Sequence, residues 1–102
     1  MASYQVLNTA SYRIDEVYLY SWDQWGEAQA KRYIQGLFDC FEKIAKRELL
    51  WKVILAEYEV SGYYTHYEKH FVYWRELSDG SVGIATILHQ SMSIGDRLLE
   101  DL

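Results

Sequence analysis

Residues 70–88 read HFVYWRELSDGSVGIATIL, and this stretch indicates two strands joined by a tight turn. Residues 70–77 are rich in aromatic and β-branched side chains, which favour extended backbone. Residues 78–81 are typical of a hairpin turn, because Asp79-Gly80 supplies the positive φ angles that such a turn needs. Residues 82–88 are almost wholly apolar, so we expect a central strand that is covered on both faces. The stretch therefore predicts a β-hairpin within an antiparallel sheet.

Further strands are predicted on either side of a long middle region. Residues 63–67 read as a strand that follows the turn signal Ser61-Gly62. Residues 4–7 form a short N-terminal strand candidate, which we expect to neighbour a later strand of the sheet. Residues 48–56 contain two apolar runs, and their pattern fits a loop, a strand or a helix extension equally well.

Two helices are predicted between the first strand and this ambiguous region, over residues 11–24 and 27–47. Asn8, Thr9 and Ser11 are candidates for the N-cap, because their side-chain oxygens can accept the free amide hydrogens of a first turn. The apolar positions recur at intervals of three and four, as they do on one face of a helix. In the first helix these positions are Ile14, Val17, Tyr18, Trp22 and Trp25.

A tight turn at Gly26 is expected to fold the two helices into an antiparallel hairpin. Gly36, inside the second helix, suggests a close approach of the neighbouring helix, and Cys40 reads as a packed thiol. Residues 93–102 form a short terminal helix candidate with Ser93 as its cap. Helices grouped apart from a run of strands predict an α+β domain, with the hairpin packed on one face of a sheet of three or four later strands.

Composition restricts the classes of function. The chain has 102 residues without proline, which favours one domain spanning residues 1–102. Its net charge of −5 argues against direct nucleic-acid binding, which depends on Lys and Arg neutralising phosphates. No basic segment followed by an apolar run begins the chain and no apolar stretch is long enough to span a bilayer, so we expect a protein of the bacterial or eukaryotic cytoplasm without membrane contact.

The chemical signals for an enzyme are weak. His66 and His70 are four residues apart, which on one strand separates them by about 13 Å, too far to share a metal ion. No phosphate-binding glycine loop stands out, so we expect neither a metal nor a cofactor. Arg75 is as well suited to pair with a carboxylate, such as Glu76 or Glu57, as to serve a reaction. His89 follows a buried strand, and we interpret it first as a structural histidine and second as a catalytic one.

Three local patterns resemble the ParE branch of the RelE/ParE toxin superfamily. Residues 25–30, WGEAQA, followed by Tyr33, look like the junction between the two ParE helices. Residues 69–75, KHFVYWR, resemble the basic, histidine and aromatic strand of these toxins. Residues 87–92, ILHQSM, look like the signature at the end of the last strand. The resemblance covers residues 4–92, in the order and spacing that the family has.

The resemblance implies a toxin of a bacterial toxin–antitoxin module, of the kind that stabilises plasmids. Such a toxin acts by binding a protein, DNA gyrase, and is neutralised by a ParD-like antitoxin within a hetero-oligomer. The antitoxin tail would lie in the groove between helices and sheet. The candidate residues for binding the antitoxin or the target are Trp22, Tyr63, Tyr64, Tyr67, Lys69, His89 and Met92.

Two alternatives follow from the same resemblance. RelE-type members cleave mRNA on the ribosome, and Lys69, Arg75 and His89 are the candidates for that reaction here. Many relatives have Arg where Ser91 stands and Asp where Ser93 stands, so the basic surface is thinner in this chain. A decayed, non-toxic family member is therefore the second alternative.

Overall fold

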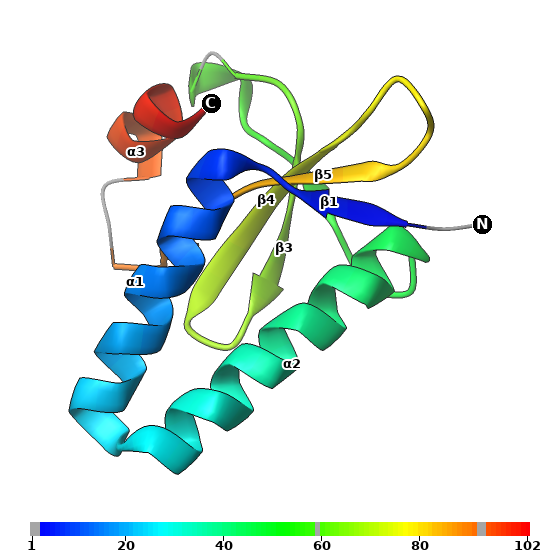
Figure 1. The fold of residues 1–102 in the computed structure, drawn as a ribbon. Helices are drawn as coiled ribbons and strands as arrows, with labels where there is room; N and C mark the ends of the chain where they lie inside the picture. Colours follow the sequence, from blue (N-terminus) through cyan, green and yellow to red (C-terminus); the bar gives the residue numbers. More distant parts are fainter. Residues whose placement is uncertain (1–2, 59, 92–93) are drawn as a thin grey trace.

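The computed structural model describes residues 3–58, 60–91 and 94–102, in which helices and strands follow one another as the sequence predicts (Figure 1). Their order along the chain is β1 (Tyr4–Val6), α1 (Asn8–Trp25), α2 (Glu27–Ala45), β2 (Lys52–Val53), the short 3-10 helix η1 (Ala56–Tyr58), β3 (Tyr63–Tyr67), β4 (His70–Glu76), β5 (Val82–His89) and α3 (Ile94–Asp101).

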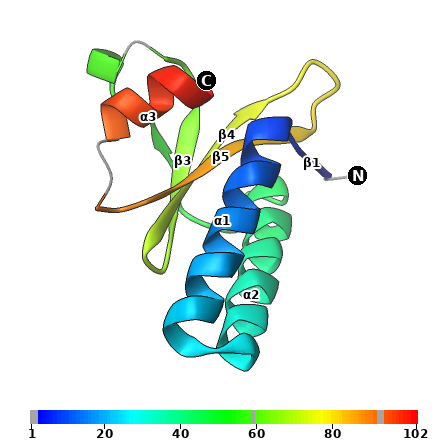
Figure 2. The same ribbon diagram turned by 60° about the vertical axis from the view of Figure 1, so that its left-hand side comes forward.

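The strands form a single five-stranded sheet with the order β1-β5-β4-β3-β2. Strands β2 to β5 are antiparallel to their neighbours, and β1 adds to β5 in parallel, with Tyr4 opposite Val82. The predicted α+β class, with an N-terminal strand, a helical hairpin and three or four later strands, is therefore confirmed; the later strands are four, and β1 makes the sheet mixed. The two views of Figures 1 and 2 show α1 and α2 running side by side and projecting beyond the end of the sheet.

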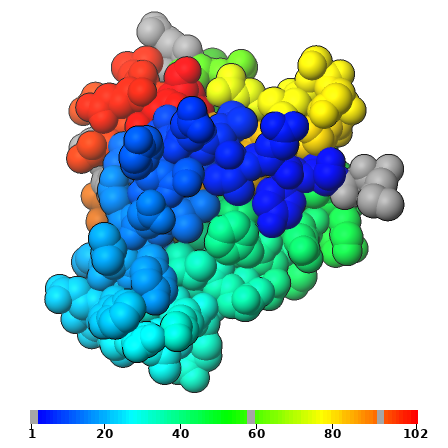
Figure 3. Space-filling view, viewed as in Figure 1, coloured from blue at the N-terminus to red at the C-terminus, as the bar shows by residue number. Residues whose placement is uncertain are grey.

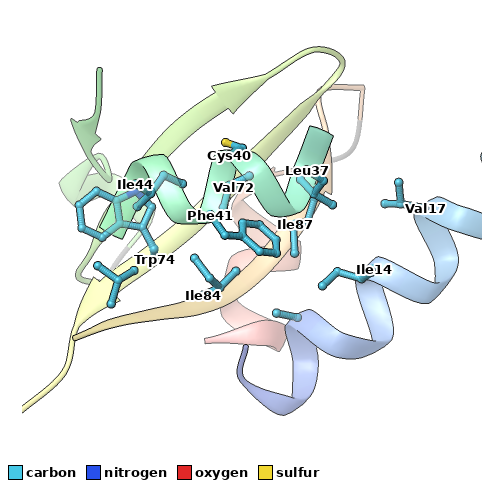
Figure 4. Close-up of a cluster of buried hydrophobic side chains, with 12 residues drawn as sticks. Ile14, Val17, Leu37, Cys40, Phe41, Ile44, Val72, Trp74, Ile84 and Ile87 are labelled. Carbon is cyan, nitrogen blue, oxygen red and sulfur yellow. The ribbon is translucent and has the colours of Figure 1, made fainter. Parts of the chain in front are cut away.

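A bulge in the central strand pair keeps the apolar side chains on the correct face. Tyr73 lies opposite Thr86 and Trp74 lies opposite Ile84, so Ala85 is the extra residue. Without this extra residue, the alternation of β5 would turn Ile84 away from the helices. The core between the helices and the sheet is shown in Figure 4; its members include Ile14, Val17, Leu37, Cys40, Phe41, Ile44, Val72, Trp74, Ile84 and Ile87.

A second, smaller core lies on the opposite face of the sheet. Tyr73 and Leu88 pack there against Ile54 and against Leu98 of α3. Figure 2 shows α3 lying across the sheet on the side away from α2. The expected terminal helix is thus present from Ile94 onward, while its proposed cap, Ser93, lies outside the described residues.

The first helix ends at Trp25-Gly26 as predicted, but its start and its buried face differ from the prediction. It begins at Asn8 with Leu7 in the N-cap position, and no side chain caps it, so the three proposed caps lie inside the helix. Its buried residues are Ala10, Ile14, Val17 and Ser21, whereas Trp22 and Trp25 are exposed. Because a single glycine joins the helices, they are close together near the turn, and small buried residues such as Ser21 and Ala30 fit there better than indole rings.

Local backbone and packing correct three smaller expectations. The second helix ends at Ala45, since Arg47 has a φ of 59° that a helix cannot continue. Glu68, with a φ of 51°, turns the chain between β3 and β4, so His66 and His70 lie on different strands. The group that approaches Gly36 closely is the hydroxyl of Tyr67 from the sheet, and not the neighbouring helix as expected. Cys40 is buried as predicted, and burial raises the pKa of its thiol to about 11.

Candidate functional site

Aromatic and basic side chains meet where the helical hairpin passes the end of the sheet, and we call Tyr20, Trp25, Lys69 and His89 the tip surface. The ring of Tyr20 lies 5.9 Å from that of Trp25 and 6.5 Å from that of His89. The ammonium of Lys69 is 5.4 Å from the centroid of the Trp25 ring, within the range of a cation–π contact. Figure 3 shows the hairpin turn standing out from the body of the molecule.

The elements that carry the tip surface explain why these side chains meet. The turn at Glu68 places Lys69 beside the last turn of α1, and the pairing of His70 with His89 aligns the end of β5 with the start of β4. Tyr20 and Trp25 are 51% and 47% exposed, although both rings are in contact with neighbouring side chains. Exposed aromatic rings that are held in place by neighbours are typical of protein-binding surfaces.

A small hollow of about 290 Å³ opens beside the tip surface. It lies between α1 and the paired ends of β4 and β5, and we call it the histidine hollow. Its walls are formed by Glu16, Val17, Tyr20, His70, His89 and Ser91. The rings of His70 and His89 meet edge to face, with 5.1 Å between their centroids.

The two histidines differ in their surroundings. His70 is 7% exposed, and burial, together with the neighbouring His89, lowers its pKa to about 4. Its Nδ1 is 2.7 Å from the hydroxyl of Tyr33, which also accepts the backbone N–H of Lys69 at 3.3 Å. His89 is more open, and its Nδ1 accepts the backbone N–H of Ser91 at 3.1 Å. His70 is therefore neutral at physiological pH and fixed by a hydrogen bond, as a structural histidine is.

A larger depression of about 700 Å³ lies on the other side of Lys69. Arg32, Tyr33 and Tyr67 contribute to its walls together with Trp25. The Tyr67 hydroxyl donates to the backbone carbonyl of Tyr33 at 3.0 Å, so this tyrosine holds β3 against α2. Burial raises the pKa of Tyr67 to about 12, which keeps the hydroxyl protonated and able to donate.

The structure separates the other predicted binding residues. Tyr63 is stacked on Trp74 in the main core, with 4.8 Å between ring centroids. Tyr64 faces the opposite side of the sheet, where it contacts Phe71 and Tyr73. Trp22 is 45% exposed near the tip and packs edge-on against Tyr18. Met92 lies outside the described residues.

The three residues considered for ribonuclease activity do not come together. His89 is opposite His70 at one end of β4, whereas Arg75 is opposite Gly83 near the other end. Five residues of strand separate His70 from Arg75, which corresponds to roughly 17 Å. Within the described part of the chain, Arg75 forms no ion pair with Glu76 or Glu57, and Glu76 instead lies 3.4 Å from Arg47. One arginine, one lysine and one histidine therefore cannot act on a single phosphate here.

A second exposed apolar surface lies at the free edge of the sheet, where sequence reasoning left the structure open. We call Leu50, Trp51, Val53 and Leu55 the edge strip. Leu50 is 93% exposed and Val53, in the edge strand β2, is 66% exposed. One indication of this exposed surface was present in the sequence. Its two apolar runs have neither helical nor strand periodicity, whereas a segment buried on one face would have a regular period.

Among the described residues, no helix is both long enough and apolar enough to span a membrane. No three side chains of His, Cys, Asp or Glu are grouped there as metal ligands.

Comparison with known proteins bears directly on the three sequence motifs. No curated protein matches the chain. A family model described as the ParE toxin of the type II toxin–antitoxin system, parDE, matches residues 4–94, from β1 to the start of α3. This match covers all three motifs and the whole helical hairpin and sheet. The chain therefore belongs to the ParE toxin family and is the toxin of a type II toxin–antitoxin system.

Proposed function

We propose that this toxin acts by binding DNA gyrase and inhibiting it, and that a ParD-like antitoxin neutralises it. The tip surface carries the proposal, because it combines fixed, exposed aromatic rings with a cation where the helical hairpin passes the end of the sheet. Rings of this kind contribute a large share of the binding energy in protein interfaces. Family membership implies an antitoxin partner, whose identity as ParD-like belongs to the proposal.

The charges favour a protein target over RNA. The chain has 15 acidic and 10 basic side chains, so its overall field repels a polyanion. Lys69 is the only basic member of the tip surface, and Arg75 lies near the opposite end of β4. A ribosome-dependent ribonuclease needs several cations around one phosphate and a group that moves a proton.

A supercoiling assay with purified gyrase and purified toxin tests the proposal. We expect the wild-type chain to inhibit supercoiling and to leave ribosome-bound mRNA intact. Trp25→Ala should raise the concentration needed for inhibition by roughly thirtyfold, which corresponds to about 2 kcal/mol for a residue central to an interface. The product of the neighbouring open reading frame should restore supercoiling when it is added in excess.

Tyr12→Ala is the matched control. Tyr12 lies on the same helix and is 72% exposed, but it is far from the tip, so its loss should leave inhibition unchanged. Equal loss of inhibition in the two variants would contradict a role for the tip surface. Codon-specific cleavage of mRNA by the wild-type chain would instead favour the RelE-like alternative, and inactivity in both assays would indicate a decayed toxin.

A further inference from the structure

The histidine hollow is lined by a histidine whose second ring nitrogen has no hydrogen-bond partner among the described residues. His70 is more than nine-tenths buried, and its Nδ1 is occupied by the Tyr33 hydroxyl. Among the described residues no hydrogen bond reaches its Nε2. In that part of the chain every side-chain nitrogen or oxygen that is wholly shielded from solvent has a partner. The Nε2 of His70 is therefore reached from outside, through the hollow that His70 lines.

The hydrogen bonds around Nδ1 determine which atom carries the proton of each neutral ring. The Tyr33 hydroxyl accepts from the backbone N–H of Lys69, and among the described residues His70 Nδ1 is the acceptor within reach of its hydrogen, so we assign the hydroxyl as donor and Nδ1 as acceptor. Because Ser91 donates its backbone N–H to His89 Nδ1, that atom is also an acceptor. A neutral imidazole that accepts at Nδ1 carries its hydrogen at Nε2. Both histidines thus present an Nε2–H donor, from residues that are paired across neighbouring strands.

The remaining walls of the hollow restrict what those donors can hold. Val17 and the ring of Tyr20 are apolar, and Glu16 is the only charged side chain among the lining residues described. Neither Lys nor Arg is among them, so a doubly charged phosphate would lack the cations it needs. A carboxylate has a single charge and two acceptor oxygens, which suit two N–H donors. The volume of about 290 Å³ leaves room for an apolar group beside it.

We propose that the histidine hollow is a binding site for a carboxylate that carries an apolar group. The carboxylate oxygens accept from Nε2 of His70 and of His89, and the apolar group lies against Val17 and Tyr20. The same chemistry is found in a free organic acid and in the C-terminal residue of a peptide chain. The inference does not depend on which macromolecule the toxin inhibits.

Nuclear magnetic resonance of the imidazole nitrogens in the full chain tests this site. The probes are benzoate, for a free acid, and N-acetylphenylalanine, for a peptide C-terminus. Inorganic phosphate and N-acetylphenylalaninamide, which lacks the carboxylate, are the negative controls. We expect saturable shifts of the Nε2 signals of His70 and His89 with at least one acid, and none with either control. The tighter of the two acids identifies the source of the natural ligand.

Two variants and one matched control make the assignment specific. His89→Gln should weaken binding of the acid at least about tenfold, because the flexible amide of glutamine does not hold its N–H donor where the imidazole ring holds Nε2–H. Glu16→Gln should strengthen binding roughly two- to threefold, because it removes a negative charge beside the hollow. His66→Gln is the control, since His66 is exposed on the other face of the sheet and stacks on Phe71.

The proposal would be overturned if both acids gave chemical-shift changes that do not saturate, or if the signals of His66 shifted as much as those of His70 and His89. Tighter binding of phosphate than of either acid, or an unchanged affinity for the acid in His89→Gln, would also overturn it. Gyrase inhibition is measured separately, so a failed toxin assay and a failed ligand titration remain distinguishable.

Discussion

Among single residues, the buried His70 makes the stability of the folded protein depend on pH. Its pKa is lowered from 6.5 to about 4 by burial and by His89, so the unfolded chain binds this proton more readily than the folded chain. The contribution of neutral His70 to the free energy of unfolding is therefore complete above pH 6.5 and is lost as the pH falls towards 4. The groups that face it are Tyr33, Tyr67, Lys69, Glu16, Tyr20 and His89.

We expect urea unfolding of the wild-type chain to lose roughly 2 to 3 kcal/mol across this window from His70 alone. His70→Gln should flatten the profile between pH 6.5 and 4, whereas His66→Gln should reproduce the wild-type slope. If the two variants had the same slope, another group would be responsible for the acid sensitivity.

Gly36 provides a second test at this scale. A methyl group at this position would collide with the hydroxyl of Tyr67, which is held by its bond to the carbonyl of Tyr33. Gly36→Ala should therefore destabilise the protein by about 1 to 2 kcal/mol, although alanine favours helices. Adding Tyr67→Phe removes the colliding atom, so the double variant should be more stable than Gly36→Ala alone. A strictly additive double-mutant cycle in urea unfolding would contradict this contact.

At the scale of elements, α3 is held by one buried ion pair. Arg13 donates to both carboxylate oxygens of Asp101 at 2.9 Å, and Thr86 adds a bond of 2.8 Å. Burial raises the pKa of Asp101, but the hydrogen bonds from Arg13 and Thr86 and the charge of Arg13 outweigh that effect and lower it overall. The stabilisation is therefore present at neutral pH and is lost as the pH falls through this lowered pKa.

Asp101→Asn should destabilise the protein by about 1 to 2 kcal/mol, since it removes the bidentate counter-charge of Arg13 and leaves its guanidinium with only the exposed carboxylate of Glu16, at 3.1 Å. The rate of amide hydrogen exchange should increase more in α3 than in the other helices and strands. The matched control is Glu100→Gln, whose carboxylate is exposed and 3.4 Å from Arg97. That change should alter the stability by less than about 0.5 kcal/mol. Similar losses in the two variants would show that the ion pair does not anchor the helix.

The elements also show how far sequence reasoning reached. Alternation and turn chemistry were sufficient for β3, β4, β5 and the Asp79-Gly80 turn, because these signals are local. Trp22 and Trp25 were wrongly predicted to be buried, because their spacing continues the apolar face of the first helix. In the structure Ser21 takes the buried position near the turn instead. The histidine hollow depends on the pairing of His70 with His89, a contact between distant residues that no local pattern reports.

For the whole molecule, the decisive feature is apolar surface on two separate parts of a small domain. The tip surface and the edge strip both remain open, and a free edge strand with exposed Leu50 and Val53 can pair with another chain. We expect the isolated toxin to self-associate at high concentration. Val53→Glu should increase the monomer fraction in light scattering without changing the urea midpoint, because Val53 is exposed. Tyr12→Glu is the control, and an equal effect there would attribute the change to net charge.

The parallel pairing of β1 with β5 has a consequence for synthesis on the ribosome. The ribosome synthesises a chain from its N-terminus at about 5 to 20 residues per second. Several seconds therefore pass between the synthesis of β1 and that of its partner strand β5. During that interval the helical hairpin can form, but Tyr20 has neither Lys69 nor His89 beside it. The tip surface is thus assembled only after β5 has been synthesised, and until then a nascent toxin lacks the surface that we propose for binding gyrase.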